Sequence, residues 1–308
     1  MKYSFIIIFF LAFSSNSFLA DDYIINSFDN HPIYGSLIKS EKPNSFLVVI
    51  IAGSGPTDRD GNNISLKSDY LKMLADELGK KGISTYRYDK RGVGKSVGHL
   101  KSGNEIKFSD YINDAVAIIN HFKESRRFKS IVVIGHSEGA LIGMIASRLI
   151  ADSFISIAGA GEDYLALLER QLSIQPAYIR SMSSPIIQEL KDKKLVDTVP
   201  PILKSLFAPN IQRYLIDASS YNPAEEISKL SIPVLIIQGD NDIQIGLNDA
   251  KILHKAAKSS RIEIIQGMNH VFRQASENRL LNLQTYGNPK LPIDINMVNI
   301  ISEFIDQQ

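Results

Sequence analysis

Three residues far apart in the sequence, Ser137, Asp242 and His270, have the side-chain types that nucleophilic hydrolysis needs. A serine hydroxyl attacks a carbonyl efficiently only when a base takes its proton, and an imidazole is that base when a carboxylate orients it. Each of the three follows an apolar run that is typical of a buried strand. If these runs are strands of one sheet, the side chains gather at its edge.

The stretch IVVIGHSEGALIG, residues 131–143, predicts a strand, a tight turn at Ser137 and then a helix. This G-x-S-x-G pattern is typical of a nucleophile elbow, a strained strand-to-helix turn that projects the serine hydroxyl above a sheet. Gly135 and Gly139 suit such a turn, because a Cβ would collide where strand and helix pack closely. The alternative, an ordinary tight turn, gives no role to the downstream partners.

The expected base is His270, the only one of six histidines that follows the last predicted strand, in IEIIQGMNHVF. A loop at that strand end places the imidazole over Ser137, as general base and then general acid. The alternative is a histidine in an ordinary surface loop.

The carboxylate is expected after the preceding strand, where VLIIQGDNDIQI contains Asp240 and Asp242. We predict Asp242, because the chain needs about two residues of turn before a side chain can aim at the histidine. Asp240 is better placed to accept hydrogen bonds from local backbone N–H groups.

Acyl transfer also needs hydrogen-bond donors for the oxyanion. One predicted donor is the backbone N–H of Glu138, the residue after the serine. The other is expected in the loop AGSGPTDRDGN, which follows a strand candidate at 46–52. Ser54 is our prediction there, with Gly53 as second choice, although these glycines are also consistent with a simple turn.

Two further patterns resemble binding sites but do not satisfy their geometry. Gly94-Lys95-Ser96 has the last letters of a phosphate-binding loop, yet Asp89 stands where that loop needs its first glycine. EF-hand spacing recurs at Asp58, Asp60, Asn62 and Asp69. Asn63 replaces the required glycine of such a loop, and a strand precedes it instead of a helix.

Composition excludes several other classes of site. The chain has no cysteine, so disulfides and thiolate metal sites are impossible. Its 34 basic and 33 acidic residues nearly balance, whereas nucleic-acid binding relies on a concentrated basic surface. The sequence therefore predicts a globular protein with no metal and no nucleic-acid partner.

The first twenty residues predict a signal peptide over 1–20. Lys2 provides a basic start and 5–13 is an unbroken apolar run. A membrane span needs about 20 apolar residues, so no stable membrane anchor is expected after cleavage. Without cysteine a lipoprotein anchor is also impossible. We expect an exported protein, periplasmic or secreted.

The rest, 21–308, predicts one α/β domain, because strand and helix candidates alternate. Such alternation predicts a mostly parallel central sheet with helices on both faces. Between about 161 and 221 the alternation stops, and a helical cap insertion is expected there, interrupted by Pro185 and Pro200-Pro201. A hairpin is predicted at 23–28 and 33–38, further strands at 46–52, 84–88, 131–134, 154–157, 233–238 and 262–265, and helices around 71–78, 110–122, 140–149, 247–258 and 293–305.

These motifs together resemble the α/β-hydrolase superfamily, in which D-x-R-G-x-G-x-S, here residues 89–96, precedes the elbow strand by one helix. The stretches AGSGPTDRDGN, GHSEG, GDNDIQI and NHVF are more specifically similar to EstD-type bacterial carboxylesterases. The resemblance implies the α/β-hydrolase fold, a Ser137-His270-Asp242 triad, no cofactor, and a small-molecule ester substrate with a short to medium acyl chain. It also implies that Asp89 and Arg91 pin the loop beside the oxyanion site. The Glu138 side chain is expected to point away from the serine.

Three alternatives remain open on the sequence. A serine aminopeptidase would need a cap carboxylate for the substrate's free amine, and Glu162, Asp163 and Glu169 are the candidates. A thioesterase is chemically accessible, but no basic cluster suggests a coenzyme A site. A catalytically silent binding module that has kept the fold is the non-enzymatic alternative.

Overall fold

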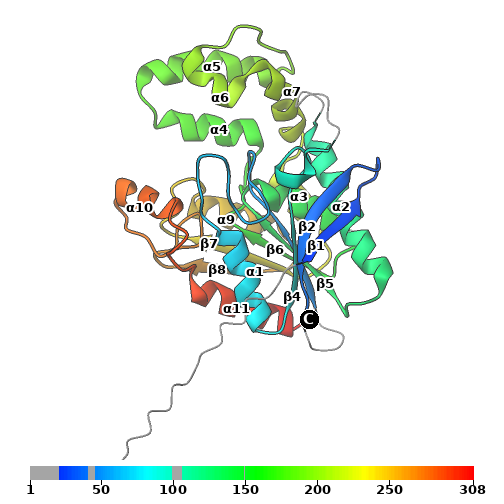
Figure 1. Cartoon of the computed structure of the whole chain (residues 1–308). Helices are drawn as coiled ribbons and strands as arrows, with labels where there is room; N and C mark the ends of the chain where they lie inside the picture. The colour runs from blue at the N-terminus through cyan, green and yellow to red at the C-terminus, as the bar shows by residue number, and fades with distance from the viewer. Residues whose placement is uncertain (1–20, 41–45, 99–105, 149) are drawn as a thin grey trace, which may run out of the picture.

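The computed structural model describes residues 21–40, 46–98, 106–148 and 150–308 (Figure 1). The predicted signal peptide, 1–20, lies outside these ranges and stays a prediction. Within the described ranges, no helix is long and apolar enough to cross a membrane.

The described strands form one eight-stranded sheet in the order β1-β2-β4-β3-β5-β6-β7-β8. The neighbours from β4 to β8 pair in parallel, while β2 is antiparallel to both β1 and β4. The predicted hairpin and mostly parallel sheet are thus confirmed. The bounds are β1 Asp21–Asn26, β2 Pro32–Ile38, β3 Leu47–Ile51, β4 Ser84–Tyr88, β5 Ile131–His136, β6 Ser153–Ile157, β7 Val234–Gly239 and β8 Ser260–Ile265.

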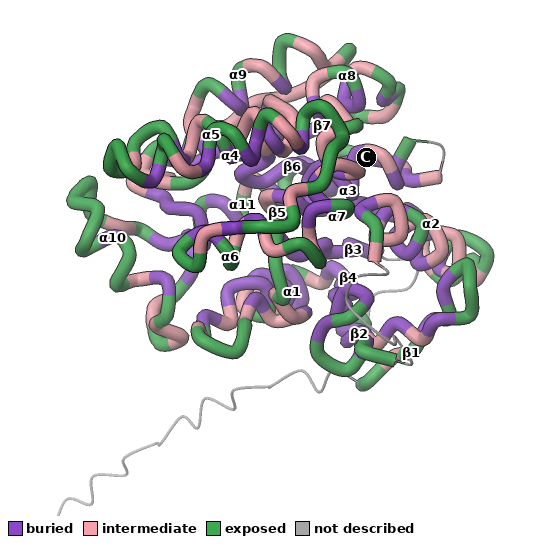
Figure 2. Tube along the Cα trace, turned by 90° about the horizontal axis from the view of Figure 1, so that it is seen from above, coloured by how far each residue is buried: buried purple, intermediate pink, exposed green. Residues whose placement is uncertain are grey.

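Helices cover both faces of this sheet, as the alternation predicts (Figure 1). Successive strand residues point to opposite faces, so Val49 packs toward α2, α3 and α9 whereas Val48 and Ile50 pack toward α1 and α11. Figure 2 shows the buried segments running through the strands between these helices. The bounds are α1 Tyr70–Lys80, α2 Phe108–Ser125, α3 Glu138–Ser147, α8 Pro223–Ser228, α9 Leu247–Ala256, α10 Arg279–Tyr286 and α11 Ile295–Asp306, with a short 3-10 helix η1 at Gly94–Val97.

The segment after β6 folds as four helices and a 3-10 turn above one edge of the sheet, and we call it the cap (Figure 1). Its apolar side chains form a core of their own, including Leu165, Ile187 and Phe207. The Asp217 carboxylate accepts from the Ser109 N–H at 2.9 Å and so ties the cap to α2. The bounds are α4 Tyr164–Ser173, α5 Ala177–Lys191, η3 Pro201–Leu203, α6 Lys204–Phe207 and α7 Pro209–Ala218.

Two local expectations differ from the structure. Pro185 was expected to interrupt the cap helices, but α5 continues through it. The proline deprives only the Ser181 carbonyl of its helical donor, and Ser181 is exposed, so water can replace that donor. Neither the short helix α8 nor the helix α10 was predicted; in α10, Leu280, Leu281 and Leu283 are exposed and form no inward apolar stripe.

Candidate active site

Ser137 is the single residue between the end of β5 and the start of α3, and its backbone has φ 55° and ψ −121°. A positive φ is strained for a residue with a Cβ and persists only where the surroundings enforce it. The Ser137 N–H donates to the Ile157 carbonyl of β6 at 3.0 Å. A Cβ on Gly139 would come within 2.4 Å of the Ile51 carbonyl oxygen, so only glycine permits this close packing. These features are those of a nucleophile elbow.

His270 and Asp242 meet beside this turn. Nδ1 of His270 lies 2.7 Å from Oδ2 of Asp242, and both side chains are buried. Because a carboxylate can only accept, Nδ1 carries the proton in the neutral imidazole, and Nε2 is then the nitrogen with the free lone pair. Burial raises the pKa of Asp242, but the His270 ring and backbone N–H donors outweigh it, so the pKa lies below its ordinary value.

The two candidate aspartates after β7 have different partners. Asp242 accepts from the backbone N–H groups of Gln244 and Ile245 through Oδ1, at 2.8 and 3.0 Å. Asp240 is exposed, and its carboxylate accepts from the Gly267 N–H at 2.6 Å. Only Asp242 is directed at the histidine.

Ser137 and His270 line the same cavity, of about 180 Å³, which we call the histidine cavity. No hydrogen bond joins their side chains in the structure of the described residues. In structures without substrate such bonds are often long and tighten only when substrate binds. The three predicted side chains therefore lie together at one edge of the sheet, and only the hydrogen bond between Ser137 and His270 is not formed.

His136, directly before the serine, holds the backbone of His270. Its Nε2 lies 2.9 Å from the His270 carbonyl oxygen, which can only accept, so this nitrogen carries the proton. Nδ1 then accepts from the Tyr70 hydroxyl at 3.0 Å. Burial lowers the pKa of His136 well below its ordinary value, so the ring is neutral.

The predicted oxyanion donors border the serine. Ser54 and Glu138 line a second cavity together with Ser137. Glu138 is the first residue of α3, so its N–H has no acceptor inside the helix. Neither this N–H nor that of Ser54 has an acceptor among the described residues, and both are available to a ligand oxygen.

The Glu138 side chain turns away from Ser137 into the interior. Its Oε1 accepts from Nζ of Lys90 at 3.1 Å, and both side chains are almost fully buried. Sequence reasoning missed Lys90. A lysine is usually exposed, and the only signal was its place between Asp89 and Arg91 in the recognised motif.

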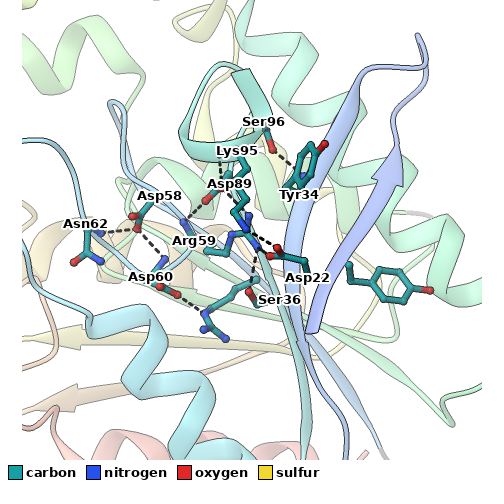
Figure 3. Close-up of polar contacts among 12 residues, drawn as sticks. Asp22, Tyr34, Ser36, Asp58, Arg59, Asp60, Asn62, Asp89, Lys95 and Ser96 are labelled. Atoms are coloured by element: carbon teal, nitrogen blue, oxygen red, sulfur yellow. Dashed lines mark hydrogen bonds and ion pairs between the residues drawn. The ribbon is translucent and has the colours of Figure 1, made fainter. Parts of the chain in front are cut away.

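Asp89 anchors the loop that carries Ser54, as the resemblance implied (Figure 3). Its carboxylate accepts from the Arg59 backbone N–H at 2.8 Å, from Arg59 Nη2 at 2.9 Å and from the Lys95 N–H at 2.9 Å. The same prediction for Arg91 is wrong. The Arg91 guanidinium donates to Asp29 of the β1–β2 turn and to Asp114 of α2, so it ties these two segments together and does not hold the loop of Ser54.

The two motifs that resembled ion sites are occupied by internal contacts. In the loop of Figure 3, Oδ1 of Asp58 accepts from the Asp60 and Asn62 N–H groups, and Asp60 pairs with Arg87 at 2.8 Å. The Lys95 N–H is bound to Asp89, not free for a phosphate. Within the described residues, no cluster of three or more His, Asp or Glu side chains could hold a metal ion.

The unpredicted helix α10 supports the loops of Asp242 and His270. Asn282 of α10 donates to the Asn241 carbonyl at 2.8 Å and accepts from Asn269 at 3.0 Å. These two partners directly precede the aspartate and the histidine. The sequence did not predict the Asn269–Asn282 side-chain pair, since no characteristic spacing in a sequence identifies two buried amides that bond each other.

The second cavity, which we call the cap cavity, lies under the cap, and its lining includes Ser137 but not His270. It has a volume of about 170 Å³. Its lining is mainly apolar and comes from α3, the cap and the loop after β7, with Leu141, Leu167, Leu168, Leu206 and Ile245.

The sheet order, the elbow at Ser137 and the cap define an α/β-hydrolase fold. A solved structure of Est1E from Butyrivibrio proteoclasticus, with ferulic acid bound, matches over 93% of this chain and 98% of that chain, with a TM-score of 0.61 and 18% identity. The chain thus has the α/β-hydrolase fold, and the family model described as serine aminopeptidase, S33 matches residues 66–161.

Two curated relatives are similar in sequence. Esterase EstD of Thermotoga maritima is 30% identical over 236 residues, which cover 73% of this chain and 54% of the relative. The chain therefore spans about half the length of that esterase. Proline iminopeptidase of Saccharolobus solfataricus is 24% identical, with 89% of each chain covered.

Proposed function

We propose that this protein is a serine hydrolase that cleaves carboxylic esters, with Ser137 as nucleophile, His270 as general base and acid, and Asp242 as the group that orients the imidazole. The observation that carries the proposal is the strained serine turn beside a buried histidine–aspartate pair. Similarity to an esterase and an iminopeptidase supports a hydrolase that acts at a carbonyl.

In the first half-reaction, the Ser137 oxygen bonds to the ester carbonyl carbon while its proton passes to Nε2 of His270. The carbonyl π pair moves to the oxygen, which accepts from the N–H groups of Ser54 and Glu138. Collapse of this adduct breaks the bond to the alcohol oxygen, which takes the proton from His270. Water then repeats the sequence on the acyl-enzyme and releases the acid.

The position of His270 sets the orientation of the substrate in this proposal. The leaving oxygen must receive its proton from Nε2, so the alcohol portion lies in the histidine cavity. The acyl portion then extends into the cap cavity. Its 170 Å³ is below the roughly 300–1,000 Å³ of pockets for drug-sized ligands, which favours short to medium acyl chains.

An aminopeptidase is the second candidate, because one relative is an iminopeptidase. A free substrate amine needs an available carboxylate. Of the three cap candidates only Glu162 lines the cap cavity, and all three already have partners. Glu162 pairs with Arg170 at 3.2 Å, Glu169 pairs with Lys191 at 2.6 Å, and Asp163 caps α4. We therefore rank esters above aminoacyl amides.

A thioester would react by the same steps, although no basic cluster in the sequence suggests a coenzyme A site. A silent binding module would give the serine turn no chemical role. We also propose that the protein acts after export, on the strength of the leader pattern at 1–20.

The test compares p-nitrophenyl acetate, butyrate and octanoate with aminoacyl p-nitroanilides, including the prolyl compound. We expect hydrolysis of the esters, fastest for the shorter chains, and a loss of at least about 10⁴-fold in Ser137→Ala. The matched control is Ser184→Ala, which changes an exposed serine of α5 and should keep full activity. Faster cleavage of the anilides would reverse the ranking, and equal rates in Ser137→Ala would refute the nucleophile.

A further inference from the structure

Lys90 is a charged side chain buried beneath the proposed oxyanion site, with 1% of it exposed. It follows β4 and has two acceptors, the Gly53 carbonyl at 2.5 Å and the Glu138 carboxylate at 3.1 Å. The Tyr111 ring lies 5.1 Å from its Nζ. The ammonium thus joins the two segments that carry the oxyanion donors.

The bond to Gly53 has a geometric consequence for Ser54. The carbonyl of Gly53 and the N–H of Ser54 belong to one planar trans peptide unit, so they point in opposite directions. When Lys90 fixes the carbonyl on the inner side, the N–H is directed outward, toward the cavities that Ser54 lines. A cation on the carbonyl also polarises the peptide and strengthens the N–H as a donor.

The bond to Glu138 has a different effect. Burying an unpaired ammonium is costly, and the carboxylate compensates its charge. A buried ion pair of this kind contributes little net stability, which leaves positioning as the better reason for it. Two partly buried tyrosines of the cap, Tyr164 and Tyr214, lie close enough to Glu138 that its charge adds to desolvation in raising their pKa values.

We propose that Lys90 is a positioning residue of the oxyanion hole, which aims and polarises the Ser54 N–H through the Gly53 carbonyl while its pairing with Glu138 keeps the second donor in register. Lys90 touches no substrate in this arrangement. The inference rests on the proposed function, since it assigns a role within the same site.

The experiment compares wild type with Lys90→Met and the double variant Lys90→Met/Glu138→Gln. The single variant leaves Glu138 buried without its cation, so a fall in melting temperature is expected. The double variant removes both charges, and its melting temperature should return close to that of wild type. Lys95→Met is the matched control, since its side chain is 59% exposed and pairs with Asp22.

The decisive readout is the activity of the double variant. We expect kcat to be about 10- to 100-fold below wild type with KM changed less than about threefold, because the donor matters most in the transition state. The affinity for a trifluoromethyl ketone, whose adduct places an oxyanion in the hole, should fall by the same factor. Lys95→Met should match wild type in all three measurements.

Two outcomes would overturn the inference. If kcat of the double variant recovers together with its melting temperature, Lys90 serves only to compensate charge. If KM rises and kcat is unchanged, Lys90 acts on substrate binding and not on the oxyanion. A wild-type protein that hydrolyses no ester would instead refute the proposed function, and this inference with it.

Discussion

Asp240 and Asp242 lie two residues apart after the same strand, yet their surroundings differ. Asp242 is buried against His270 and receives two backbone N–H groups, whereas Asp240 is exposed and bonds one. The pKa of Asp242 lies below its ordinary value. Its carboxylate is therefore ionised at any pH where the histidine is neutral, and it can fix the imidazole tautomer there. The contrast gives a matched pair for mutation.

We predict that Asp242→Asn lowers kcat for p-nitrophenyl butyrate by about 10³- to 10⁴-fold. An amide can donate to Nδ1 and so favour the wrong tautomer, an effect of this size in serine proteases. Asp240→Asn should stay within about threefold of wild type. Steady-state kinetics on both variants, with circular dichroism to check folding, decides the matter, and similar losses in the two would contradict the assignment.

Residues that follow strands could be predicted because strand ends of a parallel sheet meet at one edge. Ser137, Asp242 and His270 were found in that way, each from its own local pattern. The Lys90–Glu138 pair was not predictable, since Lys90 follows β4, Glu138 begins α3, and nothing in the local sequence of either indicates the other. Arg91 shows the opposite error: as part of the motif at 89–96 it was predicted to hold the loop of Ser54, but Asp89 alone of the two does so.

Among the elements, the alternating pattern predicted the strands and the helices α1, α2, α3, α9 and α11, because both kinds of element have strong apolar periodicity. The helix α10 was not predicted, because its main contribution is polar: Asn282 forms hydrogen bonds to the loops of Asp242 and His270. The cap helices were expected only as a group. Their arrangement depends on a separate core, which no local pattern specifies.

The cap helix α6 supplies a test of the acyl site, because Leu206 lines the cap cavity. We predict that Leu206→Trp, which fills this space, lowers kcat/KM for p-nitrophenyl octanoate by about 10-fold or more and that for the acetate by less than about threefold. The matched control is Ile202→Trp in η3, a residue that is 55% exposed. An equal loss for both esters would place the acyl chain elsewhere.

At the scale of the whole molecule, loops after β3, β5, β7 and β8 converge at one edge of the sheet, and the cap stands above that edge (Figure 1). Ser137 lines both the histidine cavity and the cap cavity, so an ester bound at the attacking oxygen has two adjoining spaces to occupy. The N-terminal hairpin lies at the opposite end of the strand order from β7 and β8. Its contacts with η1 and α2 hold the Asp89 segment that anchors the loop of Ser54.

The central claim is that the Ser137 oxygen is an activated nucleophile. The most direct measurement is the reaction of the folded protein with a fluorophosphonate, followed by peptide mass spectrometry. We expect one adduct, on the peptide that contains Ser137, at a rate reduced at least about 100-fold in His270→Ala because the base is lost. A folded protein that forms no adduct, or forms it on another residue, would contradict the account.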